Sequence, residues 1–331
     1  MLFVSAVNAV CALAIAFTIS NIFQAGRFLD LSALRSGEMK PPVVSAQTID
    51  WSQSLKSFVP ESLLSPFLSN AIPTVILLAL LFGFAARQLE KTEHETALQN
   101  IHSLIKALLF LQLKVLDFFI HLVPLAVFAS VAKVVGEHGF GMFKGLGAYL
   151  VVTLSGMAAQ IFLIYQVWIF GVARFSWLKF WREARVPALY AFGVNSSLAT
   201  LPVTLKSLSQ LKVTPTSSRL AACVGTNLNN DGILLYEVVA VLFVAQAYGI
   251  SLDIWHQFAI AGVCLMATLG VAGIPEAGII SLILVLNTVS LPTEVLPLLL
   301  TVDWIVARFR SVTNVIADMT VAIATDKLVE S

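Results

Sequence analysis

Long apolar runs separated by short polar stretches dominate this chain of 331 residues. Several of them are long enough to cross, as helices, the roughly 30 Å apolar layer of a membrane. The sequence therefore predicts an all-α membrane protein that crosses the bilayer several times. The clearest runs in the first half of the chain are residues 1–24, 74–86, 101–135 and 145–172.

Two later apolar stretches are interrupted near their middle. In residues 180–211 the interruption is the polar segment Asn195–Pro202, and in residues 257–291 it is the glycine-rich segment Gly270–Gly278. Two half-helices that meet at such a loop form a re-entrant hairpin more readily than a membrane span. Paired interruptions of this kind also point to the binding site of a transporter.

A polar helix follows each expected hairpin, so the pattern repeats within the chain. The first, residues 217–248, carries three asparagines and Asp231 in its middle. In the second, residues at spacings of three and four share one helical face. That face consists of Asp303, Ala307, Arg310, Asn314 and Asp318. Because one charge at mid-membrane costs about 2.5–3.5 kcal/mol, we expect this face to contact protein, substrate or ions, with Arg310 binding a carboxylate.

The composition supports a membrane protein and excludes several other classes. Hydrophobic residues make up 58% of the chain and charged residues only 12%, with a net charge of +1. No basic block suggests nucleic acid as a partner, and the three cysteines have no metal-like spacing. Basic residues cluster at positions 87–91, 174–185 and 206–219. Clusters of this kind face the cytoplasm in membrane proteins, so we expect these three clusters to be cytoplasmic.

Four motifs, in order and at matching spacing, resemble the dicarboxylate/amino acid:cation symporters, which have the glutamate-transporter fold. They are Ser196-Ser197 with Thr200-Leu201-Pro202, Asn229-Asn230-Asp231-Gly232, Gly273-Ile274-Pro275-Glu276-Ala277-Gly278 and Arg308-Phe309-Arg310-Ser311-Val312-Thr313-Asn314-Val315. The resemblance covers nearly the whole chain. It implies two re-entrant hairpins, an inverted repeat and an elevator mechanism, in which a mobile transport domain moves past a static trimeric scaffold.

The resemblance also implies how the chain is divided. Residues 1–26 would be the first span present and part of the transport domain, 27–56 an external loop, and 57–135 scaffold and trimerisation spans. Residues 145–331 would complete the transport domain. Its parts would be a span, a first hairpin at about 176–211, a broken helix at about 217–248, a second hairpin at about 253–292 and a last helix at about 293–328.

The family's binding residues can be transferred to matching positions in this sequence. Arg310 would hold the distal carboxylate of the substrate, and the two hairpin tips would hold the other carboxylate. The substrate-binding residues implied in this way are Ser196, Ser197, Ile274, Ala307, Arg308, Arg310, Ser311 and Asn314.

The coupling cations would be held by carboxylates and backbone carbonyls, the hard oxygen ligands that small cations prefer. Asp318 with carbonyls of Gly225, Asn229 and Asn314 would form one site, and Asp231 with Asn229 a second. Carbonyls of Asn227, Thr268, Leu269 and Val271 would form a third. Sodium and protons both remain possible as the coupling ion, and no cofactor is expected.

Ala307 departs from the pattern of the amino acid transporters in this family. They place an aspartate at that position, one turn before the arginine, where it pairs with the substrate's α-amino group. An ammonium group bound beside Ala307 would be desolvated without a counter-charge, which is costly. We therefore predict symport of a dicarboxylate such as succinate, malate or fumarate, with an acidic amino acid (glutamate or aspartate) as the alternative.

Other departures concern the ions and the start of the chain. Asn8 and Ala9 stand where a hydroxyl is expected, and Glu276 replaces a common glycine or glutamine at the second hairpin tip. Its carboxylate could carry a proton, pair with an amino group or be solvated. The family has two further spans before residue 1, so we expect a fragment or a misassigned start, truncated at its N-terminus relative to the family.

Other functions fit the sequence less well. Asp303 is interpreted as a residue that caps or hydrates the entrance of the last helix. An intramembrane hydrolase that uses Ser197 would need a histidine or lysine base at a motif and a Gly-x-Ser-x-Gly elbow, and the sequence has neither, so no enzyme is expected. A truncated subunit that does not transport is a further alternative. The expected partners are a small acidic substrate, Na⁺ or H⁺, membrane lipid and two further copies in a homotrimer.

Overall fold

The computed structural model describes residues 1–29, 72–89, 98–108, 142–270 and 277–330, together with short stretches between positions 63 and 136. The chain forms two compact units. The first consists of Met1–Val44 and Val131–Ser331, and the second of Ser45–Ser130. Over the described residues, every regular element is helical. The all-α fold class predicted from the apolar runs is confirmed.

The first unit contains two long apolar helical stretches. Helix α1 (Leu2–Phe23) ends at Gln24, which adopts the left-handed conformation and leads into the short 3₁₀ turn η1 (Ala25–Phe28). Helix α6 (Met142–Ala159) continues as two π-helical turns, η2 (Gln160–Ile164) and η3 (Val167–Val172). Among the described residues, these are the two helical stretches long and apolar enough to cross a membrane.

The first interrupted stretch folds as a pair of antiparallel helices. Helix α7 (Trp177–Val194) stops at Asn195, whose left-handed backbone ends the helix, and α8 (Ser197–Gln210) starts two residues later. Ser196 caps α8 by accepting a hydrogen bond from the backbone N–H of Ala199, as expected for a serine at an N-cap. The two helices pack against each other, so this stretch is a hairpin. Its re-entry into a membrane remains a prediction.

The polar helix that follows is broken where the asparagines occur. Helix α9 (Pro215–Arg219) runs into the π turn η4 (Leu220–Val224) and the 3₁₀ turn η5 (Gly225–Asn227). The regular helix α10 (Asp231–Ala247) begins only after Asn230. The break predicted at residues 227–231 is therefore present.

The second interrupted stretch and the last helix complete the unit. Helices α11 (Ile254–Gly270) and α12 (Ala277–Thr288) pack against each other on either side of the second interruption. Residues 271–276 lie outside the described part. The last helix, α13 (Leu296–Glu330), is continuous over 35 residues. Asp318 lies within this regular helix, and the Asn229 amide donates to its side chain.

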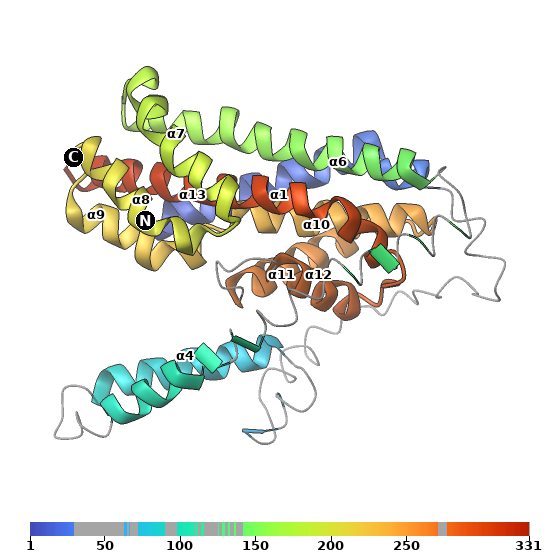
Figure 1. Ribbon diagram of the computed structural model, residues 1–331, viewed down its shortest axis with the longest axis horizontal. Helices are drawn as coiled ribbons and strands as arrows, with labels where there is room; N and C mark the ends of the chain where they lie inside the picture. Colours follow the sequence, from blue (N-terminus) through green and yellow to red (C-terminus); the bar gives the residue numbers. More distant parts are fainter. Residues whose placement is uncertain are drawn as a thin grey trace. The chain divides into compact units, whose positions relative to one another are not determined.

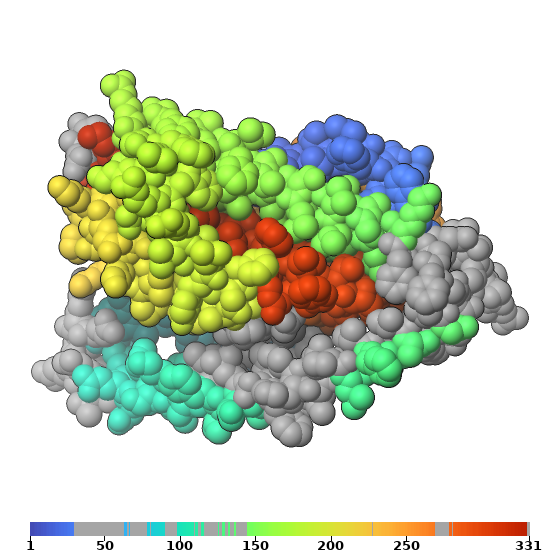
Figure 2. Space-filling view, turned by 45° about the horizontal axis from the view of Figure 1, so that its top comes forward, coloured from blue at the N-terminus to red at the C-terminus, as the bar shows by residue number. Residues whose placement is uncertain are grey.

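Helices α10 and α13 form the centre of this unit (Figure 1). All residues of α10 from Asp231 to Ala245 are buried, because α1, α6, α11, α12 and α13 pack around it. Figure 2 shows the red atoms of α13 reaching the surface between the green α6 segment and the yellow first hairpin. The side chains on the opposite face of α13 are buried, and that face carries the polar stripe.

In the second unit the longest described element is α4 (Ile72–Leu89), an apolar helix that ends with Arg87 in its last turn. Residues 98–108 are also helical. The role of residues 57–135 as a scaffold stays a prediction. Most of the expected external loop, residues 30–56, lies outside the described residues.

Gly145 allows α6 to approach the chain that leaves α1. A Cβ atom at this position would lie 2.9 Å from the backbone N and Cα of Leu29, whereas a Cβ at Gly147 would meet nothing within 4 Å. We predict that Gly145→Ala lowers the stability of the purified protein by about 1–3 kcal/mol through overpacking. Gly147→Ala, the matched control in the same helix, should be neutral or slightly stabilising. Thermal unfolding of the two variants in detergent measures the difference, and equal midpoints would contradict this account of the packing.

Candidate functional site

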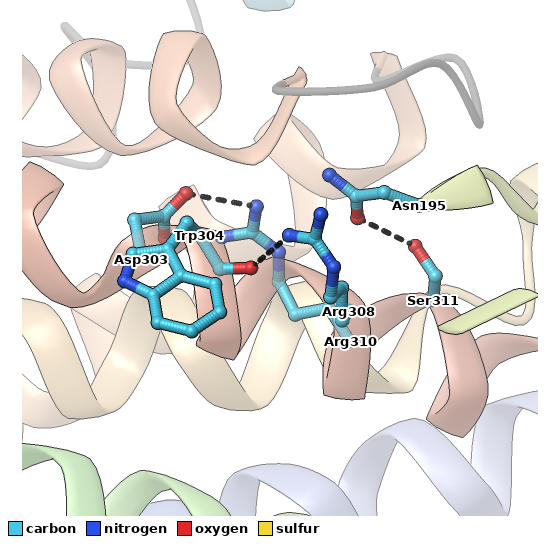
Figure 3. A network of polar contacts seen from close by, with 6 residues as sticks. All are labelled: Asn195, Asp303, Trp304, Arg308, Arg310 and Ser311. Carbon is cyan, nitrogen blue, oxygen red and sulfur yellow. Dashed lines mark hydrogen bonds and ion pairs between the residues drawn. The ribbon is translucent and has the colours of Figure 1, made fainter. Parts of the chain in front are cut away.

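Arg310 lies at the centre of the polar stripe and is 4% exposed. Its two terminal nitrogens donate to the two carboxylate oxygens of Asp303, at 3.0 and 3.4 Å. Asp303 is itself 2% exposed. The two residues are seven positions apart on α13, which is two helical turns, so one helix supplies both partners of a buried ion pair (Figure 3).

This pairing corrects the interpretation of Asp303. We had assigned it to the entrance of the helix, where it would cap or hydrate the chain. The structure shows a buried counter-charge for Arg310 instead. A lone buried guanidinium would carry a large desolvation penalty, and the carboxylate offsets part of it.

Two further elements enclose the guanidinium. Its central carbon lies 4.2 Å from the centroid of the Tyr236 ring of α10, a cation–π contact. A Cβ atom at Gly278, at the start of α12, would lie only 2.7 Å from the same carbon. Only glycine lets the second hairpin approach Arg310 this closely. The site therefore joins α13, α10 and the second hairpin.

The tip of the first hairpin reaches α13 one residue further along. Ser311 donates through its hydroxyl to the Asn195 side-chain oxygen at 3.2 Å (Figure 3). Ser197, the first residue of α8, is buried. Arg308 instead donates to the carbonyl oxygen of Trp304 in its own helix and lies over the Trp304 ring. The structure thus places Ser311 and the hairpin tip together, while Arg308 is held by its own helix.

Ala307 is 1% exposed and lies one turn before Arg310. Over the described residues, the acid nearest to it along α13 is Asp303, whose two oxygens both accept from Arg310. The structure therefore offers no uncommitted carboxylate on this helix for an ammonium group beside Ala307. Ile274 and Glu276, the residues expected at the second hairpin tip, lie outside the described residues.

Asn314 connects α13 to the broken segment before α10. Its side-chain oxygen accepts from the backbone N–H of Gly232 at 2.9 Å, and its amide donates to the Asn230 side-chain oxygen at 3.1 Å. The first N–H groups of a helix have no partner within the helix, and here a neighbouring helix supplies one. A Cβ at Gly232 would lie 2.7 Å from the Arg310 carbonyl oxygen, so the glycine permits this approach.

Asp318 and Asn229 meet one turn deeper along α13. The Asn229 amide donates to an Asp318 carboxylate oxygen at 2.9 Å, and its oxygen accepts from the Ser5 hydroxyl of α1 at 2.6 Å. All three side chains are buried. Gly225 lies beside Asn229 and accepts its backbone N–H. The residues expected for the first cation site are therefore brought together, with Ser5 as an additional member.

Asp231 has partners that the sequence did not predict. The Tyr165 hydroxyl donates to its Oδ2 atom at 2.8 Å, and the Gln160 amide lies 3.4 Å from the same atom. Both residues belong to the π-helical continuation of α6. A 3.6-residue pattern does not align residues five positions apart, which is why this pair was missed.

The third expected cation site is described only in part. The Thr268 carbonyl oxygen lies 3.5 Å from the Asn230 amide. Only the backbone is described for Asn227 and Leu269, and Val271 lies outside the described residues. Groups of three or more histidine, cysteine or acidic side chains that could hold a metal ion were not found within the described residues.

Glu237 is a further buried acid that the sequence analysis passed over. It is fully buried in α10 and accepts hydrogen bonds from Thr268 of α11 at 3.1 Å and from Ser281 of α12. Glu237 therefore ties α10 to both arms of the second hairpin. Its position in an otherwise apolar helix was a usable signal, because an acid inside a membrane helix is rarely without a function.

Taken together, these contacts define a helical membrane protein in which a buried arginine and several buried acids lie on the continuous helix α13 and around the broken segment before α10, with the two hairpins packed against them. That is the arrangement of a secondary transporter. The chain belongs to the sodium:dicarboxylate symporter family, whose sequence pattern it matches over residues 1–328. The resemblance inferred from the four motifs is therefore confirmed.

Individual relatives fall into two groups. The chain is 34% identical over 208 residues to excitatory amino acid transporter 3 of Oryctolagus cuniculus, an alignment that covers 62% of this chain and 40% of the relative. It is 30% identical over 321 residues to the C4-dicarboxylate transport protein of Deinococcus deserti, with 96% and 71% covered. The corresponding protein of Pectobacterium atrosepticum is 29% identical over 310 residues, with 93% and 71% covered. The chain spans less than half the length of the excitatory amino acid transporters. All of these relatives are transporters, so the chain belongs to a family of transporters and not of enzymes.

The ion pair gives a stability prediction. In Asp303→Asn the buried Arg310 loses its counter-charge, which should destabilise the protein by roughly 3–5 kcal/mol. The double variant Asp303→Asn/Arg310→Gln, which carries neither charge, should be less destabilised than the single variant. Thermal unfolding in detergent measures both.

A suitable control is Asp253→Asn, because this exposed aspartate interacts with His256 at the surface. Asp253→Asn should therefore destabilise the protein less than Asp303→Asn does. If the double variant is no more stable than Asp303→Asn alone, the pair does not act as a compensated charge.

Proposed function

We propose that the protein is a cation-coupled symporter of dicarboxylates of the succinate, malate or fumarate type, working by an elevator mechanism. The observation that carries the proposal is Arg310, a buried guanidinium enclosed by α10, α13 and the second hairpin. A guanidinium presents five N–H donors in a fork that matches carboxylates. Two of its nitrogens are engaged by Asp303, and a substrate carboxylate would exchange with or add to these bonds.

The choice of a dicarboxylate rests on Ala307 and Asp303 together. An α-ammonium group beside Ala307 would find the Asp303 oxygens already engaged by Arg310. A diacid that carries hydrogen or hydroxyl at that carbon meets no such penalty. The names of the two C4-dicarboxylate transport proteins agree with this choice, whereas those of the excitatory amino acid transporters favour the alternative, glutamate or aspartate.

For the coupling ion we propose sodium, in keeping with the family's name. Asp318 and Asn229 supply buried oxygen ligands of the kind that a small cation prefers. Asp231, two residues after Asn229, supplies another. Proton coupling, which would involve Glu276, is the competing proposal. A homotrimer in the plasma membrane follows from the same family reasoning, as does the scaffold role of residues 57–135.

Transport itself supplies the direct test. Proteoliposomes containing the protein should accumulate labelled succinate under an inward sodium gradient and lose this uptake without sodium. Arg310→Cys should abolish succinate uptake, because the substrate loses a charge-assisted bidentate contact. Arg185→Cys, which removes an exposed arginine of α7, should retain uptake. Normal succinate transport by properly inserted Arg310→Cys would show that the substrate site is elsewhere.

Ala307 gives a prediction about specificity. Ala307→Asp should reverse the preference from succinate to aspartate, because it supplies a counter-charge for the ammonium group and repels an unaminated diacid. The shift in relative affinity should be about a hundredfold, the size of a desolvation penalty of a few kcal/mol. Ala307→Asn, which is similar in size but uncharged, serves as the control and should leave succinate preferred. Competition against labelled succinate measures the order.

Glu276 could alter this outcome by meeting the ammonium group from the second hairpin. A wild-type preference for aspartate that disappears in Glu276→Gln would assign the counter-charge to that residue. A preference for aspartate that survives in Glu276→Gln would contradict the argument from Ala307, and the function would then be acidic amino acid transport. Ligand-dependent stabilisation without any uptake would instead favour a subunit that does not transport.

A further inference from the structure

The π-helical continuation of α6 turns two polar side chains toward the same carboxylate. In a regular helix, with 3.6 residues per turn, residues five positions apart lie on different sides. A π-helix bonds each residue to the fifth one along, so such residues come to lie one above the other. Gln160 and Tyr165 are related in this way across η2, and both reach Asp231.

The contact is closed to solvent on all sides. Tyr165 and Gln160 are both 0% exposed, and Asp231 is 2% exposed. The Tyr165 hydroxyl donates to Oδ2 of Asp231 at 2.8 Å, within the usual range for an O–H···O hydrogen bond. Hydrogen bonds to charged groups are worth more than neutral ones, about 1.5–3 kcal/mol. In this state protein donors thus stabilise the carboxylate.

The same cluster contains buried polar atoms without a partner. Gln160 donates to the Asn8 carbonyl oxygen at 3.0 Å, and the Asn8 side-chain oxygen accepts from Trp168 at 2.7 Å. Within the described residues, the Gln160 side-chain oxygen and the Asn8 amide nitrogen have no hydrogen-bond partner. Such orphan groups are rare and call for a ligand or water. The amide group that carries this unpaired oxygen lies beside the Asp231 carboxylate, and an amide oxygen is a ligand that a hard cation accepts.

We propose that Tyr165 competes with the coupling cation for Asp231, an inference that rests on the cation-coupled symport proposed above. Without the cation, the phenol donates to Asp231 and keeps the buried carboxylate compensated. An arriving cation takes that oxygen, displaces the hydroxyl and gains the unpaired Gln160 oxygen. Tyr165 is thus a positioning residue that weakens cation binding at this acid, so that the ion can be released again.

The proposed competition predicts the direction in which the sodium affinity changes when the hydroxyl is removed. Tyr165→Phe removes only the hydroxyl, which destabilises the cation-free state and leaves the cation-bound state unchanged. The sodium concentration that gives half of the maximal rise in unfolding temperature should therefore fall about tenfold or more. This factor corresponds to one hydrogen bond to a charged acceptor. A tyrosine that served as a cation ligand would produce the opposite change.

The measurement is the sodium-dependent rise in the unfolding temperature of the purified protein, titrated without substrate. The matched control is Tyr149→Phe, a change in the regular part of α6. Tyr149 is also 0% exposed, but its hydroxyl has no hydrogen-bond partner over the described residues. This control should titrate like the wild type. Tyr165→Met, which also lacks the hydroxyl, should shift in the same direction as Tyr165→Phe and provides a second variant.

The Asp231→Asn background tests whether the change in sodium affinity acts through the Asp231 carboxylate. In that background the hydroxyl has no charged acceptor, so adding Tyr165→Phe should cause no further shift. Unchanged or weaker sodium binding in both Tyr165 variants would overturn the competition, and so would a shift that persists in Asp231→Asn. A wild type whose stability and succinate uptake both ignore sodium would overturn sodium coupling itself, and this inference with it. The two failures are thus distinguishable.

Discussion

The central constraint on this structure is that charged side chains on a membrane helix must be compensated inside the protein. Arg310 is the clearest case, since its partner Asp303 comes from the same helix two turns away. Tyr236 and the backbone at Gly278 close the remaining sides. A pair held in this way is costly to break, because removal of one partner leaves a buried charge uncompensated. Helix α10 and the start of α12 therefore pack closely against this guanidinium.

The same requirement explains how broken helices are tolerated. Each break exposes backbone groups that apolar surroundings cannot satisfy. At the start of α10, Asn314 from the neighbouring helix accepts the Gly232 N–H. At the first hairpin, Asn195 ends α7 in a left-handed conformation and Ser196 caps α8. At these two breaks the polar residues therefore satisfy backbone groups, apart from any part they play in binding a ligand.

The sequence predicted the positions of these elements better than it predicted their partners. The spacing of Arg310, Asn314 and Asp318 identified the buried face of α13, and glycine, proline and asparagine marked each interruption, because both signals are local. Partner choice is not local. Asp303 was misassigned because a carboxylate near a helix start and one paired two turns away look alike in sequence. Tyr165 was missed because a π turn shifts the helical period, and no residue pattern announces that shift.

Two turns of α10 connect the whole site. Asp231 accepts a hydrogen bond from Tyr165, which directly follows η2. The Gly232 N–H donates to Asn314 of α13. One turn later, the Tyr236 ring supports Arg310, and Glu237 binds both arms of the second hairpin. The cation proposed at Asp231 and the substrate carboxylate proposed at Arg310 would therefore lie next to residues that are within two turns of each other on α10. In the symport proposed above, the start of α10 would connect the ion site to the substrate site.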